Sequence, residues 1–524
     1  MLNKRYMKYL TFISSVILIA ILLITPDILF SIINKSFVIA NNPEALIFII
    51  LASFLFVTNT NKTFSIFLLS FLSIIQTAQF CNIKYFGTLI SPPALYLMTQ
   101  EISDVIDEAV SVFWNYIYIF PLVALPYFAI YKVAHSKRLI KHKFGSLITI
   151  LTLAIMIFLT EKQSPNATLF SLENSIRTIT GYIEVTTKDQ HFKTYKPYSV
   201  HKFFMPRVKM PKTIVYILGE STNTDHMSLF GYAEDTTPKL RKLAKNDNFY
   251  YTTGIAGGIV TISSCKFMCN AIREPDNVKE SSLDTVNLFK IAKSYGFKTF
   301  YISAQKSDLL SSIGGTPYID IMITREQYPT QFSKKRDSFL FELIEKQEFT
   351  NRNFIVIHQR CIHSPYTKTV PKFFVPSKKF SSNKNNTINE YDNAILYNDT
   401  VIAGLFNIFN KFDGTFYIFW ASDHNELTGQ NGLWGHGHLD PETAKIPILI
   451  QSNDANFMKH VKEIFAITHY DICCIIADLM GHKIVNPNEE KDIYYINGVD
   501  FLGRCGYIKF RKDHKNKKIE YFTN

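Results

Sequence analysis

Apolar residues crowd into the first third of this 524-residue chain. Five uncharged stretches there, at residues 10–24, 45–57, 64–75, 112–131 and 144–159, approach the length that crosses a lipid bilayer. The rest of the chain alternates strand-like and helix-like patterns. The sequence therefore predicts a transmembrane domain of five helices over residues 1–160, a polar bridging segment over residues 161–206 and a globular domain over residues 207–524.

Basic residues set the predicted orientation in the membrane. Five of them lie between the fourth and fifth predicted spans: Lys132, Lys137, Arg138, Lys141 and Lys143. Cytoplasmic loops carry the excess of Lys and Arg, so the amino terminus is expected inside and the globular domain in the periplasm. These flanking residues also help to explain the formal net charge of +12, and no nucleic-acid motif is present. We expect a multi-pass protein of a bacterial inner membrane.

Residues 91–108 predict a helix on the outer surface of the membrane, begun by two prolines. Gln100, Asp104 and Glu108 recur every four residues and would share one face of this helix. They are candidates for holding a donor lipid. A solvated helix face explains them equally well.

Four stretches of the globular part predict buried strands, at residues 213–218, 299–303, 354–357 and 415–420. Helical patterns, such as residues 284–295 and 339–347, separate them. This alternation is typical of an α/β fold with a mainly parallel sheet and helices on both faces. The residues that follow the strands would then converge on one edge of the sheet.

Metal-ligating residues follow two of these strands. Glu220 comes after the first strand, and Asp423 and His424 come after the last. Three such ligands suit a catalytic zinc site, which keeps one position open. His436 and His438 follow within a glycine-rich loop. One Asp-His pair alone would be explained by a polar turn, but the convergence of several strand ends favours a metal site.

The segment GGIVTISS, residues 257–264, holds the best candidates for a nucleophile. Thr261, Ser263 and Ser264 are all chemically suitable. A helix that starts near Thr261 would direct free N–H groups at an anion. The alternative is a simple helix cap.

Seven cysteines are scattered along the chain, too irregularly to define a disulfide framework. Cys265 and Cys269 are close enough in sequence to form a small disulfide loop if the globular domain lies in an oxidising compartment.

Four motifs in order resemble the bacterial phosphoethanolamine transferases. They are GESTNTDHMSLFGYAEDTTP at residues 219–238, GGIVT at 257–261, HQRCIHSP at 358–365 and SDHNELTGQNGLWGHG at 422–437. Members of that family are inner-membrane enzymes with five transmembrane helices and a periplasmic domain of the alkaline-phosphatase and sulfatase fold. The resemblance spans the whole chain in architecture.

The resemblance implies specific roles. The family's zinc ligands fall on Glu220, Asp423 and His424, and its threonine nucleophile, which also touches zinc, falls on Thr261. Its phosphate-side histidines fall on His363 and His436. These two histidines could also bind a second metal ion. His358 opens the same motif without a role that we can assign.

The chain departs from the family pattern beside the nucleophile. Gly257 and Phe267 stand where the lipid A-modifying members usually carry paired cysteines. The motif forms GEST and MSLFGY are more similar to the members that act on core sugars or other periplasmic glycans. The acceptor therefore stays open between a lipid A phosphate and an inner-core sugar.

The expected reaction is transfer of phosphoethanolamine from phosphatidylethanolamine to lipopolysaccharide or lipooligosaccharide through a phospho-threonine intermediate, by a monomeric enzyme. A glycerol-phosphate transferase of the lipoteichoic-acid-synthase type would share this plan with a different donor. A membrane-anchored binding protein without catalysis would share only the fold. Sulfatase activity is disfavoured because residues 261–265 lack the Pro and Arg that follow a sulfatase nucleophile.

Overall fold

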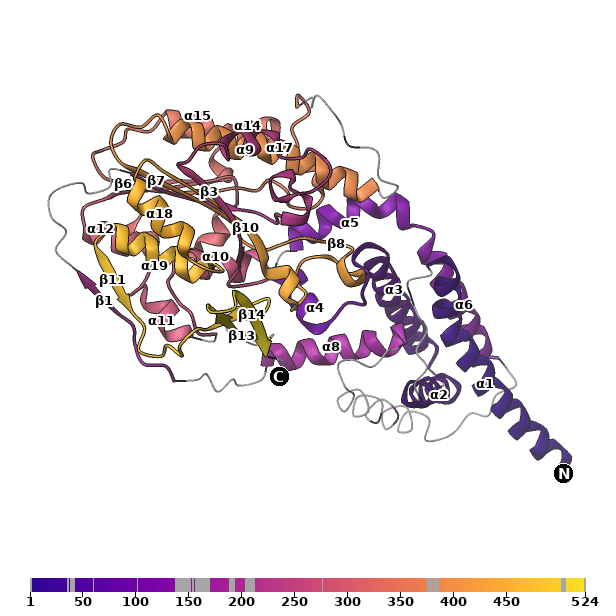
Figure 1. Cartoon of the computed structure of the whole chain (residues 1–524). Coiled ribbons are helices and arrows are strands. Elements are labelled where there is room, and N and C mark those ends of the chain that lie inside the picture. Colours follow the sequence, from indigo (N-terminus) through magenta and orange to yellow (C-terminus); the bar gives the residue numbers. More distant parts are fainter. Residues whose placement is uncertain are drawn as a thin grey trace. The chain divides into compact units, whose positions relative to one another are not determined.

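Figure 1 shows the computed structural model of the chain. It describes residues 2–34, 37, 43–59, 61–100, 102–136, 152, 155, 170–187, 194–202, 213–275, 277–374, 380, 386–500 and 506–522. The chain forms two compact units. The first comprises Met1–Asp189 with Gly429–Trp434, and the second comprises Gln190–Thr428 with Gly435–Asn524.

The first unit is helical. Its described helices are α1 (Leu2–Ile33), α2 (Pro43–Thr58), α3 (Lys62–Phe86), α4 (Pro92–Gln100), α5 (Ile102–Tyr116), α6 (Ile119–Ala134) and α8 (Ser171–Thr187). Among the described residues, only Tyr6–Ile33 and Lys62–Phe86 are long and apolar enough to cross a membrane, while Ala45–Thr58 and Ile119–Ala134 are shorter apolar helices. The predicted span at residues 144–159 lies outside the described residues, apart from two isolated positions. The count of five spans is therefore not confirmed.

The predicted span at residues 112–131 is wrong as a single helix. The structure ends α5 at Tyr116 and begins α6 at Ile119. Pro121 explains the break, because a continuous helix would need an N–H at this position and proline has none. Restarting the helix at Ile119 places Pro121 in the first turn, where the missing N–H costs nothing.

Helix α8 lies within residues 161–206, which the sequence predicts as a polar bridge. Its first residue is held by Asp27 of α1, whose carboxylate accepts from the Ser171 N–H and hydroxyl, each at 3.0 Å. Gln76 of α3 donates to the same carboxylate at 3.2 Å. These contacts satisfy the start of the helix from positions far away in the chain, which local sequence patterns do not reveal.

The second unit is built on a sheet of seven strands in the order β3-β10-β7-β2-β6-β4-β5. The strands are β2 (Thr213–Gly219), β3 (Phe249–Ile255), β4 (Lys298–Ser303), β5 (Ile321–Ile323), β6 (Asn353–His358), β7 (Phe416–Ser422) and β10 (Lys445–Ser452). Six of them run in the same direction, and only β10 runs the opposite way, because it pairs antiparallel with both β7 and β3. The predicted α/β fold with a mainly parallel sheet is confirmed.

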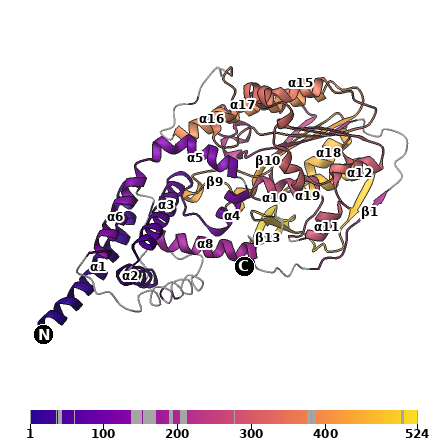
Figure 2. The same ribbon diagram turned by 180° about the vertical axis from the view of Figure 1, so that it is seen from behind.

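Helices cover both faces of this sheet. They are α9 (Pro238–Leu243), α10 (Thr261–Cys269), α11 (Val278–Leu283), α12 (Leu288–Ser294), α13 (Leu310–Ile313), α14 (Pro329–Lys335), α15 (Phe339–Glu345), α16 (Tyr366–Thr369), α17 (Asn386–Phe409), α18 (Ala455–Glu463) and α19 (His469–Leu479). Both views place α15 and α17 on one side of the sheet and α10, α12 and α19 on the other (Figures 1 and 2).

Smaller strands complete the unit. β1 (Ser199–Lys202) pairs with β11 (His482–Val485), and β12 (Ile493–Asn497), β13 (Tyr507–Asp513) and β14 (Lys518–Phe522) form a three-stranded sheet. The short strands β8 (Leu427–Thr428) and β9 (Trp434–Gly435) pair with each other and lie within the motif at residues 422–437.

The central strands are buried along their whole length, as both faces of a parallel sheet require. Every residue of β2, β6 and β7 is buried. Val215 and Ile217 of β2 share a core cluster with Leu340 of α15 and Val401 of α17. This packing makes the sheet a rigid platform for the residues at its edge.

Strand register brings the ends of four strands level. Leu218 of β2 lies opposite His358 of β6 and Ala421 of β7, and Ser303 of β4 lies opposite His358. The residues that follow each strand therefore emerge at the same edge.

Gly219, the last residue of β2, is packed against Trp420. A Cβ atom at position 219 would lie 2.4 Å from Cζ2 of this fully buried tryptophan. The indole cannot easily move, because its Nε1 donates to Gln359 Oε1 at 2.7 Å. We expect Gly219→Ala to destabilise the unit by about 1–3 kcal/mol, the usual cost of overpacking. A lower thermal unfolding midpoint of the purified protein would show this.

Trp420→Phe supplies the control for that substitution, because it removes the ring atoms that the new methyl group would meet. Gly219→Ala should cost less in the Trp420→Phe background than in the original protein. An equal cost in both backgrounds would contradict the packing argument.

Candidate metal centre

Three ionisable side chains meet at the edge of the sheet. Glu220 follows β2 and the pair Asp423 and His424 follows the neighbouring strand β7, so strand register places them together. All three are fully buried, and their ligand atoms lie within 4.8 Å of one another. His424 Nε2 is 3.2 Å from Asp423 Oδ2 and 3.7 Å from Glu220 Oε1. Two carboxylates and one imidazole form a donor set that suits zinc.

Hydrogen bonds outside the cluster orient its ligand atoms. His424 Nδ1 lies 3.1 Å from the Asn425 carbonyl oxygen, so Nδ1 carries the proton and Nε2 faces the two carboxylates. Asp423 Oδ1 accepts from the Ser221 N–H at 3.0 Å. Asp423 Oδ2 is buried, and its contact with His424 Nε2 at 3.2 Å is an ion pair that lacks hydrogen-bond geometry. A cation bound between these atoms would satisfy that oxygen, so the residues fit a metal ion.

Burial and mutual charge control the protonation of the cluster. Burial raises the pKa of Glu220 well above its usual value, and the nearby charge of Asp423 raises it further. Burial alone would lower the pKa of His424, but the charges of Asp423 and Glu220 and the polar contacts with Asp423 and Asn425 together outweigh burial and bring the pKa to about 10. Burial alone would raise the pKa of Asp423, but the charge of His424 and the hydrogen bonds from His424 and Ser221 together lower it to about 2. Without a metal, a proton on His424 therefore balances the buried carboxylates.

Thr261 is the hydroxyl residue that reaches this cluster. Its Oγ1 lies 3.3 and 3.4 Å from the two carboxylate oxygens of Glu220 and 3.3 Å from His424 Nε2. Ser263 Oγ instead donates to the Val260 carbonyl at 3.2 Å. The hydroxyl of Ser264 is buried without a hydrogen-bond partner among the described residues. Geometry thus separates three candidates that the sequence left open.

Thr261 is also the first residue of α10, as the sequence predicts for this helix. No side chain caps the helix start, so the alternative explanation of a helix cap does not apply. Gly258 lets the backbone before the helix lie close to the first turn of α10, since a Cβ atom at position 258 would be 2.4 Å from Ser263 Oγ. The free N–H groups of the first turn remain available to an anion.

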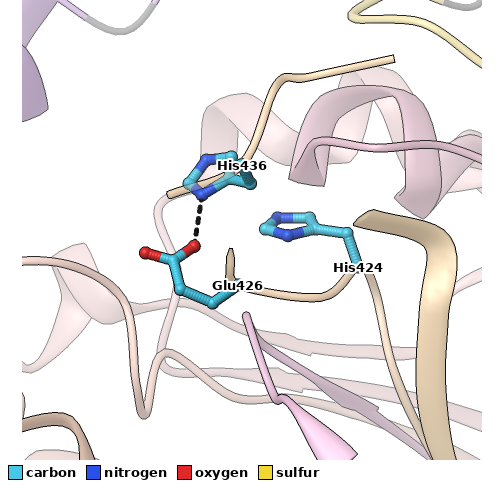
Figure 3. A group of neighbouring side chains, drawn as sticks. All are labelled: His424, Glu426 and His436. Atoms are coloured by element: carbon cyan, nitrogen blue, oxygen red, sulfur yellow. Dashed lines mark hydrogen bonds and ion pairs between the residues drawn. The ribbon is translucent and has the colours of Figure 1, made fainter. Parts of the chain in front are cut away.

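A second possible metal group shares His424. It adds Glu426 and His436, which face each other in Figure 3 with the His424 ring beside them. His436 Nδ1 lies 2.8 Å from Glu426 Oε2, and the His424 and His436 ring centroids are 4.3 Å apart. Sequence reasoning missed Glu426. Its position two residues after His424, in the same motif, was the available signal.

His363 lies near this second group. The centroid of its ring is 6.5 Å from that of His436, and its Nδ1 is 2.5 Å from the Ser364 carbonyl oxygen. The preceding residue, Ile362, has a φ of +77°, which is rare for a β-branched side chain. Backbone strain of this kind concentrates at functional loops.

His358, from the same motif, points elsewhere. Its Nδ1 lies 2.9 Å from the Tyr301 hydroxyl and its Nε2 lies 3.7 Å from Cys265 Sγ. Burial lowers the pKa of His358 to about 4, so the ring is neutral and belongs to the core. The small loop considered for Cys265 and Cys269 is not formed, because both thiols are free.

The remaining predicted site residues belong to the first unit. The predicted helix at residues 91–108 is described as α4 and α5, on either side of position 101. A donor-lipid role for Gln100, Asp104 and Glu108 stays a prediction.

Asp423→Asn tests the metal centre. The substitution removes the negative charge that the buried ligands share, and we expect zinc affinity to fall by more than about 100-fold, because loss of a group that only supports a ligand already costs about 10–100-fold. Competition with a chelating indicator measures this affinity. Asp399→Asn is the matched control, since Asp399 is equally buried but binds the backbone of Lys239 and Leu240. Unchanged zinc affinity in Asp423→Asn would contradict the assignment.

Comparison with known proteins gives three findings. The family model described as Sulfatase matches residues 212–482. The Kdo(2)-lipid A phosphoethanolamine 7''-transferase of Salmonella typhimurium is 28% identical over 307 residues, which cover 52% of each chain. The phosphoethanolamine transferase EptA of Helicobacter pylori is 26% identical over 288 residues, covering 50% of this chain and 53% of the relative. The chain thus spans about half the length of the curated relatives it matches.

A solved structure extends the comparison to the fold. The integral membrane lipooligosaccharide phosphoethanolamine transferase A of Neisseria meningitidis superposes with a TM-score of 0.62 and 17% identity, covering 93% of this chain and 98% of that one. The predicted resemblance to phosphoethanolamine transferases is confirmed by these relatives.

Proposed function

This chain belongs to the sulfatase family, and from that membership and the geometry of the metal centre we propose that it transfers phosphoethanolamine from phosphatidylethanolamine to a lipopolysaccharide or lipooligosaccharide acceptor. One observation carries the proposal. The Thr261 hydroxyl lies within 3.4 Å of both Glu220 carboxylate oxygens and of His424 Nε2. The names of the relatives, which include lipid A phosphoethanolamine transferase, support the choice of donor group and acceptor class.

Zinc is the proposed metal. Glu220, Asp423 and His424 would hold it with Thr261 beside it, and bound zinc would lower the pKa of the threonine hydroxyl and draw charge from the phosphoryl group. His436, paired with Glu426 and near His363, is placed to contact the phosphoryl oxygens or to move a proton. The group of His424, Glu426 and His436 supports a second metal.

The reaction divides into two displacements. In the first, Thr261 Oγ1 forms a bond to phosphorus, the bond from phosphorus to the diacylglycerol oxygen breaks, and the threonine proton passes to that oxygen through the site. In the second, an acceptor oxygen forms a bond to phosphorus, the bond from phosphorus to Thr261 Oγ1 breaks, and the proton of the acceptor group passes to Oγ1 through the site. This division lets two bulky lipid substrates use one site in turn.

Location and organisation follow from the same proposal. The enzyme would be a monomer in a bacterial inner membrane, crossing it several times over residues 1–160, with a bridging segment at residues 161–206. Its catalytic domain at residues 207–524 would face the periplasm. The two helices able to span a membrane and the membrane-protein relative of matching fold support this arrangement.

The acceptor is either a lipid A phosphate or an inner-core sugar. Gly257 is packed so closely on Phe267 that a Cβ atom at position 257 would lie 2.6 Å from the Cβ of Phe267. This contact replaces the cysteine pair that the resemblance associates with lipid A-modifying members. Mass spectrometry of lipopolysaccharide from cells with and without the gene distinguishes the two acceptors.

Thr261→Ala tests the covalent step. The variant should keep its fold but lose transfer by about a thousand-fold or more, because removing a nucleophile eliminates the step that depends on it. With the original protein in phosphatidylethanolamine vesicles, mass spectrometry should find phosphoethanolamine on the peptide that contains Thr261. Fragment spectra must place the adduct, since Ser263 and Ser264 precede the same tryptic site at Lys266.

Ser264→Ala is the matched control for that experiment. It removes a hydroxyl from the same helix that does not reach the ligands, so adduct and transfer should persist. An adduct on Ser263 or Ser264 in the original protein would refute the assignment.

Donor choice separates the proposed function from a glycerol-phosphate transferase. Vesicles that carry head-group-labelled phosphatidylethanolamine should label Thr261 and release diacylglycerol, whereas labelled phosphatidylglycerol should leave the protein unlabelled. Labelling from phosphatidylglycerol alone would replace the proposed function with the alternative.

A further inference from the structure

Gln305 lies between the metal centre and an arginine. It follows β4 and is 2% exposed. Its Nε2 donates to Glu220 Oε2 at 2.7 Å and to the Gln359 carbonyl at 3.0 Å. Its Oε1 accepts from Arg360 Nη1 at 2.9 Å. One buried amide therefore links a metal-ligating carboxylate to a guanidinium group.

Chemistry fixes the orientation of this amide. A guanidinium group only donates hydrogen bonds and an ionised carboxylate only accepts them. The amide oxygen must therefore face Arg360 and the amide nitrogen must face Glu220. The opposite orientation would set NH₂ against guanidinium and oxygen against carboxylate, two repulsive contacts. Arg360 thus determines which atom Gln305 presents to Glu220.

Both ends of this link are held by the backbone. The Gln305 N–H donates to Ser303 Oγ at 2.9 Å, and the Gln305 carbonyl accepts from the Arg325 N–H at 3.2 Å. The N–H groups of Arg360 and Cys361 both donate to Asp337 Oδ2, at 2.8 and 2.9 Å. The amide and the arginine are therefore presented from anchored loops.

Glu220 receives its contacts on separate oxygens. Ser221 Oγ donates to Oε1 at 2.8 Å, while Gln305 donates to Oε2. Without the bond from Gln305, the carboxylate could rotate and lose the position in which Oε1 faces His424. Groups that orient a metal ligand in this way contribute substantially to metal affinity.

We propose that Gln305 is a positioning residue for the Glu220 ligand, and that Arg360 acts through Gln305 by fixing the orientation of its amide. The inference rests on the proposed metal-dependent function. It assigns a role to two residues that come from different strands and lie outside the ligand set.

Gln305→Met and Arg360→Met test the relay by zinc affinity, measured on the full-length protein with a competing chelator. Gln305→Met keeps the volume of the side chain and removes its hydrogen bonds, so affinity should fall about 10–100-fold. Arg360→Met should weaken binding by a smaller factor, and Arg360→Lys, which restores a donor, should recover part of the loss. Because Arg360 acts through Gln305, Arg360→Met should add nothing in the Gln305→Met background.

Two substitutions far from the site are matched controls. Gln451→Met changes a glutamine of β10 that is equally buried, and Arg352→Met changes a half-buried arginine that donates to the Tyr295 carbonyl. Both should keep the original zinc affinity. Thermal unfolding of each variant shows whether it is folded, and Arg360→Met, at a half-buried position, keeps the test available if Gln305→Met does not fold.

The outcomes distinguish the inference from the function on which it rests. If the original protein binds no zinc, the proposed function fails. If it binds zinc and the Gln305→Met and Arg360→Met variants bind it equally well, only the relay is overturned. Additive losses in the double variant would also overturn the relay, because Arg360 would then act independently of Gln305.

Discussion

The structure depends on burying three ionisable groups together at the end of a sheet. Glu220, Asp423 and His424 are completely shielded from solvent, and isolated charges in such a place cost several kcal/mol each. Their closeness makes the burial tolerable, because a positive charge lies beside Asp423 and the raised pKa of Glu220 favours its uncharged form. A proton on His424 supplies that charge in the protein alone, and a divalent cation would supply more.

The backbone near this cluster adopts two uncommon conformations. Ser221 has a φ of +48°, a conformation that few non-glycine residues adopt, and it directs its N–H at Asp423. Ile362 is in a similar conformation in the loop that carries His363. A strained backbone conformation persists only where the surrounding packing allows no other. Here the fully buried strands β2, β6 and β7 provide that tight packing.

Local sequence patterns failed where the chain makes distant contacts. Helix α8 begins at Ser171, whose N–H and hydroxyl donate to the carboxylate of Asp27, far away in the chain. No pattern in the nearby sequence predicts this contact. The break between α5 and α6 could have been predicted from the sequence, since Pro121 lies within the run of apolar residues that predicted one span. The mean hydropathy of the segment hardly changes with one proline, whereas a continuous helix needs the backbone N–H that proline lacks.

The sequence by itself determined four of the seven strands of the central sheet and the convergence of Glu220, Asp423 and His424 at their ends, because buried parallel strands are continuous apolar runs and the residues that follow them must lie at one edge. Residue chemistry left Thr261, Ser263 and Ser264 open, with only the family resemblance favouring Thr261, and it did not single out Glu426, Gln305 or Arg360. Only the tertiary structure decided among these residues. Hydrogen bonds act over about 3 Å, and which side chains come that close is set by strand register and helix placement, which local sequence patterns do not contain.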